Sequence, residues 1–177
     1  ALPSKEGKLL AHTVDQYITD FYKDENWEHM VAPGMVYISQ ATEWGTLYSL
    51  EELTLLSQVC HKHHIPLFVD GARLAYALGS SQNDVTLPDL ARLADVFYIG
   101  GTKCGALFGE AVVLPDGNRI PHFLTLIKQH GALLAKGRLL GIQFDELFKD
   151  NRYFEIGKQA CLYAEEIKQA LQKKGLP

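Results

Sequence analysis

Residues 65–73 read Ile-Pro-Leu-Phe-Val-Asp-Gly-Ala-Arg, and residues 96–103 read Val-Phe-Tyr-Ile-Gly-Gly-Thr-Lys. Each stretch begins with a short apolar run that is rich in β-branched and aromatic residues and has glycine close behind it, which is typical of a buried strand. A charged group follows each run: Asp70 with Arg73 three residues later, and Lys103. The sequence therefore predicts two buried strands that deliver charged groups at their carboxyl ends.

The segments on either side of these strands are predicted to build a parallel sheet. A strand at 35–38 precedes a helix that Ser49 opens, with Glu52 three residues later, so that each side chain satisfies a backbone N–H of the other. Pro88 marks the first turn of another helix before the strand at 95–99. Strand–helix–strand units build parallel sheets with helices on their faces. We therefore expect an α/β fold.

The two ends of the chain are predicted to be mainly helical. Apolar residues at three-and-four spacing predict an amphipathic helix over 4–22, with Ser4 as its cap. A strand over 110–114 is expected to be followed by a turn over 115–118. Two further helical segments are predicted, over 120–148 with interruptions at Gly131, Gly137 and Gly141, and over 153–174.

Composition restricts the class of protein. A chain of 177 residues with 47% hydrophobic and 21% charged residues is expected to form one domain with a sizeable core. The net charge of −4, without any basic run, argues against binding to nucleic acid or to an anionic membrane. No apolar stretch approaches the roughly 18 residues that a membrane span requires. We expect a soluble protein.

Cysteine and histidine usage points away from disulfides and metal sites. The three cysteines are an odd number at wide spacing, which favours reduced thiols and a cytoplasmic location. The histidines at 61, 63 and 64 lie at a predicted helix end without a carboxylate pattern, so no metal site is expected.

The charged strand ends suggest one site. In open α/β sheets, ligands bind at the carboxyl ends of strands, so Asp70, Arg73 and Lys103 are expected to face one crevice. A lysine amine can condense with a carbonyl ligand, a carboxylate can hold a pyridine nitrogen protonated, and a guanidinium matches a carboxylate. Plainer readings stay open, because an aspartate at a strand end is often a turn residue and a lysine after two glycines is often solvated.

Residues 37–53, 64–74 and 100–111 resemble the threonine aldolase and β-eliminating lyase family, and residues 131–138 resemble the segment that follows the family's cofactor strand. The resemblance implies the fold of aspartate-aminotransferase-like enzymes, a three-layer α/β/α large domain that is apparently truncated here. Residues 1–150 would be its central part, and residues 151–177 a helix leading towards a small C-terminal domain that is itself absent. Nothing in residues 1–22 resembles the glycine-rich phosphate-binding turn of this family.

Carried over residue by residue, the resemblance implies that Lys103 bonds to the cofactor aldehyde and that Asp70 pairs with the pyridine nitrogen. Arg73 would contact the phenolic oxygen of the cofactor or the carboxylate of the substrate. Gln40 and Thr102 complete the implied cofactor-binding set. The implied cofactor is pyridoxal 5'-phosphate.

Further site residues follow less directly from the resemblance. His29 precedes the Gln40 loop at the spacing of an active-site histidine in aldolases of this family, and would handle the proton of a β-hydroxyl group; the alternative is a loop histidine without a role. Lys128, Lys136 and Arg138 fall where the family places cations near the cofactor phosphate, and the alternative is an exposed helix face.

The implied function is that of a lyase that cleaves the Cα–Cβ bond of a β-hydroxy-α-amino acid to glycine and an aldehyde. Substrates of the threonine, allo-threonine or phenylserine type, and a homodimer or homotetramer, are expected. A β-elimination from amino acids would use the same residues and stays an alternative. A non-catalytic oligomerisation fragment is a third. The sequence Gly-Thr-Lys-Cys-Gly-Ala at 101–106 departs from the Ser-Lys-Gly-Leu-Gly-Ala pattern of typical threonine aldolases, so the substrate stays open.

Overall fold

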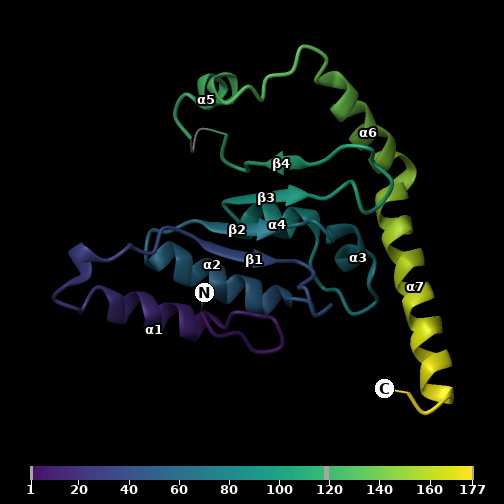
Figure 1. Cartoon of the computed structure of the whole chain (residues 1–177), viewed down its shortest axis with the longest axis horizontal. Coiled ribbons are helices and arrows are strands. Elements are labelled where there is room, and N and C mark those ends of the chain that lie inside the picture. Colours follow the sequence, from purple (N-terminus) through teal and green to yellow (C-terminus); the bar gives the residue numbers. More distant parts are fainter. Residues whose placement is uncertain (1, 118–119, 177) are drawn as a thin grey trace.

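The computed structural model describes residues 2–117 and 120–176 of the chain (Figure 1). Its strands are β1 (Val36–Ser39), β2 (Leu67–Asp70), β3 (Val96–Ile99) and β4 (Ala111–Val113). Its helices are α1 (Ala11–Phe21), η1 (Trp27–His29), α2 (Leu50–Lys62), α3 (Leu74–Gly79), α4 (Leu87–Leu93), α5 (Phe123–Gln129), α6 (Arg138–Phe148), η2 (Lys149–Asn151) and α7 (Arg152–Lys173). No helix of the described part is long and apolar enough to cross a membrane.

The four strands form one mixed sheet in the order β1-β2-β3-β4. The first three strands are parallel, and β4 runs antiparallel to β3. A helical crossover separates β1 from β2 and β2 from β3, whereas the short connection between β3 and β4 contains no helix. A parallel pair requires a long crossover, so the short connection reverses the chain direction. The predicted parallel arrangement of the first three strands is confirmed.

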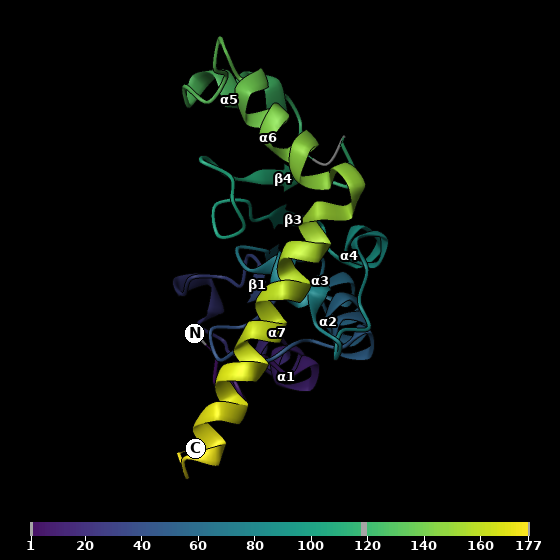
Figure 2. The ribbon, with the colours of Figure 1, turned by 90° about the vertical axis from the view of Figure 1, so that its right-hand side faces the viewer.

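One face of the sheet is buried beneath helices. α2 and α4 pack against β2 and β3, and α1 packs beside α2 on the same side (Figure 2). Capping boxes open both of the covering helices, at Ser49 with Glu52 in α2 and at Thr86 with Asp89 in α4, and the α2 box confirms the predicted one. The strand residues on this face are Val36, Ile38, Leu67, Val69, Phe97 and Ile99, all buried. Full burial of one such side chain contributes about 1.5–3 kcal/mol, so this face holds most of the core.

The opposite face of the sheet is open in the described residues. It carries Tyr37, Phe68, Tyr98 and Val112, each partly or largely exposed. The predicted α/β class is confirmed. Of the three expected layers, the described residues form the sheet and one of the two helical layers.

α7 runs along the carboxyl edge of the parallel strands, where it packs on α3 (Figure 1). Gly157 permits this contact, because a Cβ atom there would lie 1.8 Å from the carbonyl oxygen of Ala75. The buried Tyr153 donates a hydrogen bond to the carbonyl oxygen of Gly100 at 2.9 Å. The start of α7 is therefore part of the sheet's own core. That residues 151–177 lead to a further domain stays a prediction, and Pro177 lies outside the described residues.

Two predicted helix boundaries are wrong. α1 begins at Ala11 after an uncapped Leu10, not at Ser4, because Glu6 and Gly7 have positive φ angles of 54° and 77° and reverse the chain. Gly141 lies inside α6 and does not interrupt it. In contrast, Gly131 follows α5 with a positive φ of 67°, as an interruption there requires. The predicted turn over 115–118 ends at Asn118, which lies outside the described residues.

Candidate active site

Asp70 ends β2 at the carboxyl edge of the sheet and is half-buried. Its Oδ1 atom accepts a hydrogen bond from the backbone N–H of Ala72 at 2.9 Å and another from the hydroxyl of Tyr98. Its Oδ2 atom accepts a hydrogen bond from the hydroxyl of Tyr37. The two tyrosines come from the strands on either side, β1 and β3. Three adjacent strands thus contribute to the environment of one carboxylate.

The two tyrosine rings are aligned by Phe68 between them. Tyr37 is the register partner of Phe68 on the neighbouring strand, and their rings stack with centroids 5.2 Å apart. Phe68 meets Tyr98 edge-on at 6.2 Å. Side chains two residues apart on a strand point to the same face, and diagonal neighbours on adjacent strands are within reach of an aromatic ring. The aromatic row of Tyr37, Phe68 and Tyr98 therefore directs both hydroxyls towards Asp70.

This environment keeps the Asp70 carboxylate ionised. Burial raises the pKa of Asp70, but hydrogen bonds from Tyr37, Tyr98 and the N–H of Ala72, together with the charge of Lys103, outweigh it and bring the pKa below the ordinary 3.8. The hydrogen bond that Tyr37 donates to Asp70, and burial, raise the pKa of Tyr37. Burial and the same carboxylate raise the pKa of Tyr98. Both phenols therefore stay protonated as donors.

The ends of β2 and β3 are joined through glycine backbone. The N–H of Gly100 donates a hydrogen bond to the carbonyl oxygen of Gly71 at 2.9 Å. A Cβ atom on Gly71 would lie 1.8 Å from the carbonyl oxygen of Tyr98, so no larger residue fits without displacing backbone. This close approach brings the turn that carries Lys103 beside the end of β2.

Lys103 lies in a turn after β3, and its side chain is exposed. The hydroxyl of Tyr76 donates a hydrogen bond to its backbone carbonyl oxygen, which holds the turn against α3. Within residues 2–117 and 120–176 the amine of Lys103 makes no hydrogen bond or ion pair, but its charge acts on Asp70. The structure therefore brings together a free amine and an ionised carboxylate, as the strand ends predict.

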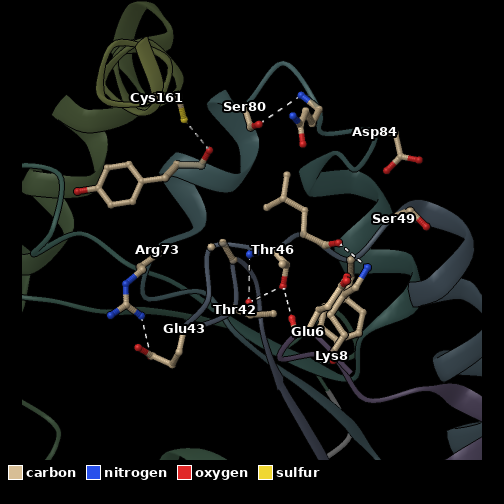
Figure 3. A pocket seen from close by; sticks show the side chains of 16 residues that line it. Glu6, Lys8, Thr42, Glu43, Thr46, Ser49, Arg73, Ser80, Asp84 and Cys161 are labelled. Atoms are coloured by element: carbon tan, nitrogen blue, oxygen red, sulfur yellow. Dashed lines mark hydrogen bonds and ion pairs between the residues drawn. The ribbon is translucent and has the colours of Figure 1, made fainter. Parts of the chain in front are cut away.

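Arg73 precedes α3 and also faces this edge. Its Nη1 atom donates to Oε1 of Glu43, on the loop after β1, at 2.7 Å, and the charge of Asp70 also acts on the guanidinium. A cavity of about 660 Å³ opens beside this ion pair, bounded by the loop after β1, α3 and α7 (Figure 3). A ligand carboxylate entering from this cavity would meet Arg73 already paired with Glu43.

Thr102 and Gln40 make local contacts in this structure. The hydroxyl of Thr102 donates to Glu110 at 3.2 Å, and Glu110 also accepts the N–H of Gly101 at 2.7 Å. Gln40 is 1% exposed, and both ends of its amide bond to the backbone of Tyr48, at 2.9 and 3.1 Å. These contacts fix the two loops that border the site, and direct cofactor binding by either side chain stays a prediction.

His29 is not brought to the same edge of the sheet. It ends η1, on the loop that leads into β1, and this loop lies at the amino ends of the strands (Figure 1). Asp70 and Lys103 follow the carboxyl ends. Parallel strands place these two groups of loops at opposite edges, so one copy of the chain does not join His29 to Asp70. Lys128, Lys136 and Arg138 are exposed around α5 and α6, as the alternative of a solvated helix face expects.

Three groups at this site were not predicted from the sequence, namely the phenols of Tyr37 and Tyr98 and the carboxylate of Glu43. The sequence does contain a signal for the tyrosines, because each stands between two apolar residues of a predicted strand, and successive side chains of a strand point to opposite faces. No comparable local pattern marks Glu43, whose partner lies 30 residues later.

Among residues 2–117 and 120–176, the carboxyl edge of the sheet holds a lysine amine without a hydrogen-bond or ion-pair partner near an ionised aspartate. This arrangement is that of an α/β protein that binds a ligand at the carboxyl ends of its strands. The chain belongs to the beta-eliminating lyase family, whose sequence profile matches residues 1–174. The predicted family is confirmed.

Individual relatives support the same family. The chain is 32% identical over 135 residues to the low specificity L-threonine aldolase of Pseudomonas aeruginosa and 34% identical over 128 residues to that of a Pseudomonas species. These matches cover 75% and 71% of this chain but only 38% and 36% of the relatives. The solved threonine aldolase of Leishmania major superposes with a TM-score of 0.89 at 46% identity, covering 99% of this chain and 51% of that protein. The chain thus spans about half or less of the proteins it matches.

Proposed function

We propose that this chain carries the cofactor edge of a lyase that cleaves the Cα–Cβ bond of a β-hydroxy-α-amino acid to glycine and an aldehyde. The carrying observation is that an ionised Asp70 and a Lys103 amine without a partner among the described residues lie at one sheet edge, close enough for the lysine charge to act on the carboxylate. The names of the Pseudomonas and Leishmania relatives support the aldolase activity and an amino acid such as L-threonine as the substrate.

The residues of this edge fit pyridoxal 5'-phosphate. Asp70 offers a carboxylate to the protonated ring nitrogen, and Lys103 offers an amine that can bond to the aldehyde. When bound, this cofactor serves as the sink for the electrons of a broken bond at Cα. The chain's contribution at this edge is to keep Asp70 ionised, through Tyr37 and Tyr98, and to hold the Lys103 turn next to it.

Arg73, which pairs with Glu43 in this structure, is the proposed binding group for the substrate carboxylate. A guanidinium binds a carboxylate through two parallel hydrogen bonds, and Arg73 already holds one carboxylate, that of Glu43, at 2.7 Å. Glu43 is largely exposed, so its side chain can move away without uncovering a buried charge. We propose that the α-carboxylate of the amino acid takes its place on Arg73.

The role proposed for His29 requires a second copy of the chain. A homodimer or homotetramer, as expected from the resemblance, would permit the amino edge of one copy to reach the carboxyl edge of another. His29 would then accept the proton of the β-hydroxyl group as the Cα–Cβ bond breaks. A cytoplasmic location is proposed with this activity, supported by three cysteines that form no disulfide.

The decisive experiment replaces Lys103 by alanine. With pyridoxal 5'-phosphate and L-threonine, the native protein is expected to release glycine and acetaldehyde, and Lys103→Ala to lose activity on the order of 10³-fold or more. The variant should also lose the visible absorbance of the lysine-bound cofactor. Lys168→Ala, which removes an exposed lysine of α7, is the matched control and should behave like the native protein. An unchanged cofactor spectrum in Lys103→Ala would refute the assignment.

A second candidate is β-elimination from an amino acid that carries a leaving group at Cβ, which the description of the matching family favours. It uses the same Asp70 and Lys103 and yields a 2-oxo acid and ammonia. Assays of pyruvate from L-serine and of acetaldehyde from L-threonine, with one protein preparation, distinguish the two reactions.

A third candidate is a non-catalytic oligomerisation fragment. A titration with pyridoxal 5'-phosphate tests it directly. A fragment of this kind would show only the absorbance of the free aldehyde, whereas the proposed lyase would show a shifted band that depends on Lys103.

A further inference from the structure

The carboxylate of Asp70 accepts three hydrogen bonds although the residue is only partly buried. Tyr98 and the N–H of Ala72 both donate to Oδ1, and Tyr37 donates to Oδ2. The backbone N–H two residues later is the ordinary partner of an aspartate in a turn. The two phenols go beyond that, because they come from two other strands and are aligned by Phe68.

We propose that Tyr37 and Tyr98 are positioning residues that fix the plane of the Asp70 carboxylate and keep it charged for a cationic ring nitrogen. This inference rests on the proposed function for the identity of that ring. Hydrogen bonds to an ionised group are roughly twice as strong as neutral ones, so two phenols can hold the carboxylate in one orientation. A fixed orientation matters because the direction of the carboxylate decides whether it meets the ring nitrogen in line.

The two tyrosines are expected to differ in role. Tyr98 shares Oδ1 with the N–H of Ala72 and is partly buried, so it anchors the inner oxygen. Tyr37 is 49% exposed and is the partner of Oδ2, the oxygen with fewer donors. A carboxylate oxygen has two lone pairs, so Oδ2 can accept a ring N–H while Tyr37 stays in place.

Other charged groups also face Asp70. Lys103, from the turn after β3, and Arg73, before α3, both act on its charge, and the hydroxyls of Tyr37 and Tyr98 also interact with each other. Both cations favour the ionised form of Asp70. In the proposed function, however, Lys103 bonds to the cofactor aldehyde and Arg73 binds the substrate carboxylate. The two phenols, in contrast, have no separate role in the proposed reaction, and both donate their hydroxyl hydrogen to Asp70.

The test measures the titration of Asp70 in the protein without cofactor. The protein is labelled with ¹³C at aspartate side-chain carboxyls, and the Asp70 signal, assigned by its absence in Asp70→Asn, is followed against pH. The midpoint is expected to rise in Tyr37→Phe and in Tyr98→Phe and to rise furthest in the double variant, since each change removes a donor to the charged form. Tyr163→Phe, which removes an exposed phenol of α7, is the matched control and should leave the midpoint unchanged.

A second readout links the phenols to the cofactor. Binding of pyridoxal 5'-phosphate is measured by absorbance from mildly acidic to neutral pH. The acid limb of the binding curve is expected to move to higher pH in both phenylalanine variants, with several-fold weaker binding at the acidic end. Circular dichroism confirms the fold, and Tyr37→Phe alone suffices if Tyr98→Phe does not fold, because Tyr37 is half-exposed.

The outcomes separate this inference from the proposed function. An Asp70 midpoint that is unchanged in folded Tyr37→Phe and Tyr98→Phe overturns the inference, as does a shift of equal size in Tyr163→Phe. A shifted midpoint with an unmoved acid limb of cofactor binding also overturns it. Neither measurement requires a substrate, so a failure to release glycine and aldehyde would refute the proposed reaction only.

Discussion

The two faces of the sheet are made by the same strands but differ in kind. One face is apolar and buried beneath α1, α2 and α4 (Figure 2). The other carries an aromatic row, a carboxylate and partly exposed side chains. Neighbouring residues of β2 show the difference most directly, because Leu67 and Val69 are 1% exposed whereas Phe68 and Asp70 are partly exposed.

This difference shows how a strand can serve stability and chemistry together. Successive side chains point to opposite faces, so alternate positions are free to follow different constraints. The buried face requires shape and apolar surface, whereas the open face requires donors and charges at defined positions. Substitutions at neighbouring positions of one strand should therefore have separable effects on stability and on ligand binding.

The largest effect on stability is expected at Leu67. Leu67→Ala removes a fully buried side chain and leaves a cavity, which should lower the free energy of unfolding by about 2–5 kcal/mol. The adjacent Phe68→Ala, on the open face, should cost less, about 1–2 kcal/mol, because part of its ring stays in contact with water. Urea unfolding followed by circular dichroism measures both. Equal losses would contradict the contrast between the faces.

A smaller loss is expected at Gly71, where the strand ends meet. Gly71→Ala places a methyl group against the carbonyl oxygen of Tyr98, and the resulting backbone shift should cost about 1–3 kcal/mol. It should also weaken cofactor binding, because it separates Asp70 from the Lys103 turn. Gly34→Ala is the control, since a Cβ atom there would meet nothing within 4 Å. A Gly71→Ala protein as stable as Gly34→Ala would contradict the close approach.

The open face should contribute stability that depends on pH. The folded-state pKa of Asp70 lies below its ordinary 3.8, so its stabilisation is present above that value and is lost as the pH falls through the folded pKa. Asp70→Asn should therefore flatten the loss of stability in acid. Unfolding midpoints in urea across an acidic pH series measure this, with the exposed Asp145→Asn of α6 as control. An acid profile of Asp70→Asn as steep as the native one would disagree with the hydrogen bonds to Asp70.

The smallest effect on stability is expected at Glu43. Glu43→Gln weakens an exposed ion pair with Arg73, and such pairs contribute about 0–1 kcal/mol. In contrast, free glycine should bind more tightly to the cofactor-loaded variant than to the native protein. The carboxylate of glycine would no longer compete with the carboxylate of Glu43 for Arg73. Isothermal calorimetry measures binding, with Glu165→Gln, from the exposed pair with Lys168, as control. Weaker glycine binding in Glu43→Gln would show that Glu43 assists the ligand.

Much of the fold was predictable because buried positions of strands and helices recur along the sequence as apolar residues at regular spacing. The apolar runs that become β2 and β3 stand out by composition, and Ser49 with Glu52 marks the start of α2 by local hydrogen bonding. The start of α1 was not predictable. The apolar spacing typical of a helix continues past Glu6 and Gly7, but the chain reverses direction at these two residues. The antiparallel direction of β4 follows from a short connection whose path only the structure shows.

The candidate site divides in the same way. By itself, the sequence determined that Asp70 lies at the carboxyl end of one buried strand and Lys103 shortly after the end of another, since each follows an apolar run and glycine accompanies both. Only the tertiary structure decided which groups surround them, namely the phenols of Tyr37 and Tyr98 at Asp70 and Glu43 at Arg73. These partners lie about 30 residues apart in the chain. Strand register sets the contacts of the two phenols, and the path of the loop after β1 sets that of Glu43. Neither leaves a pattern in the local sequence.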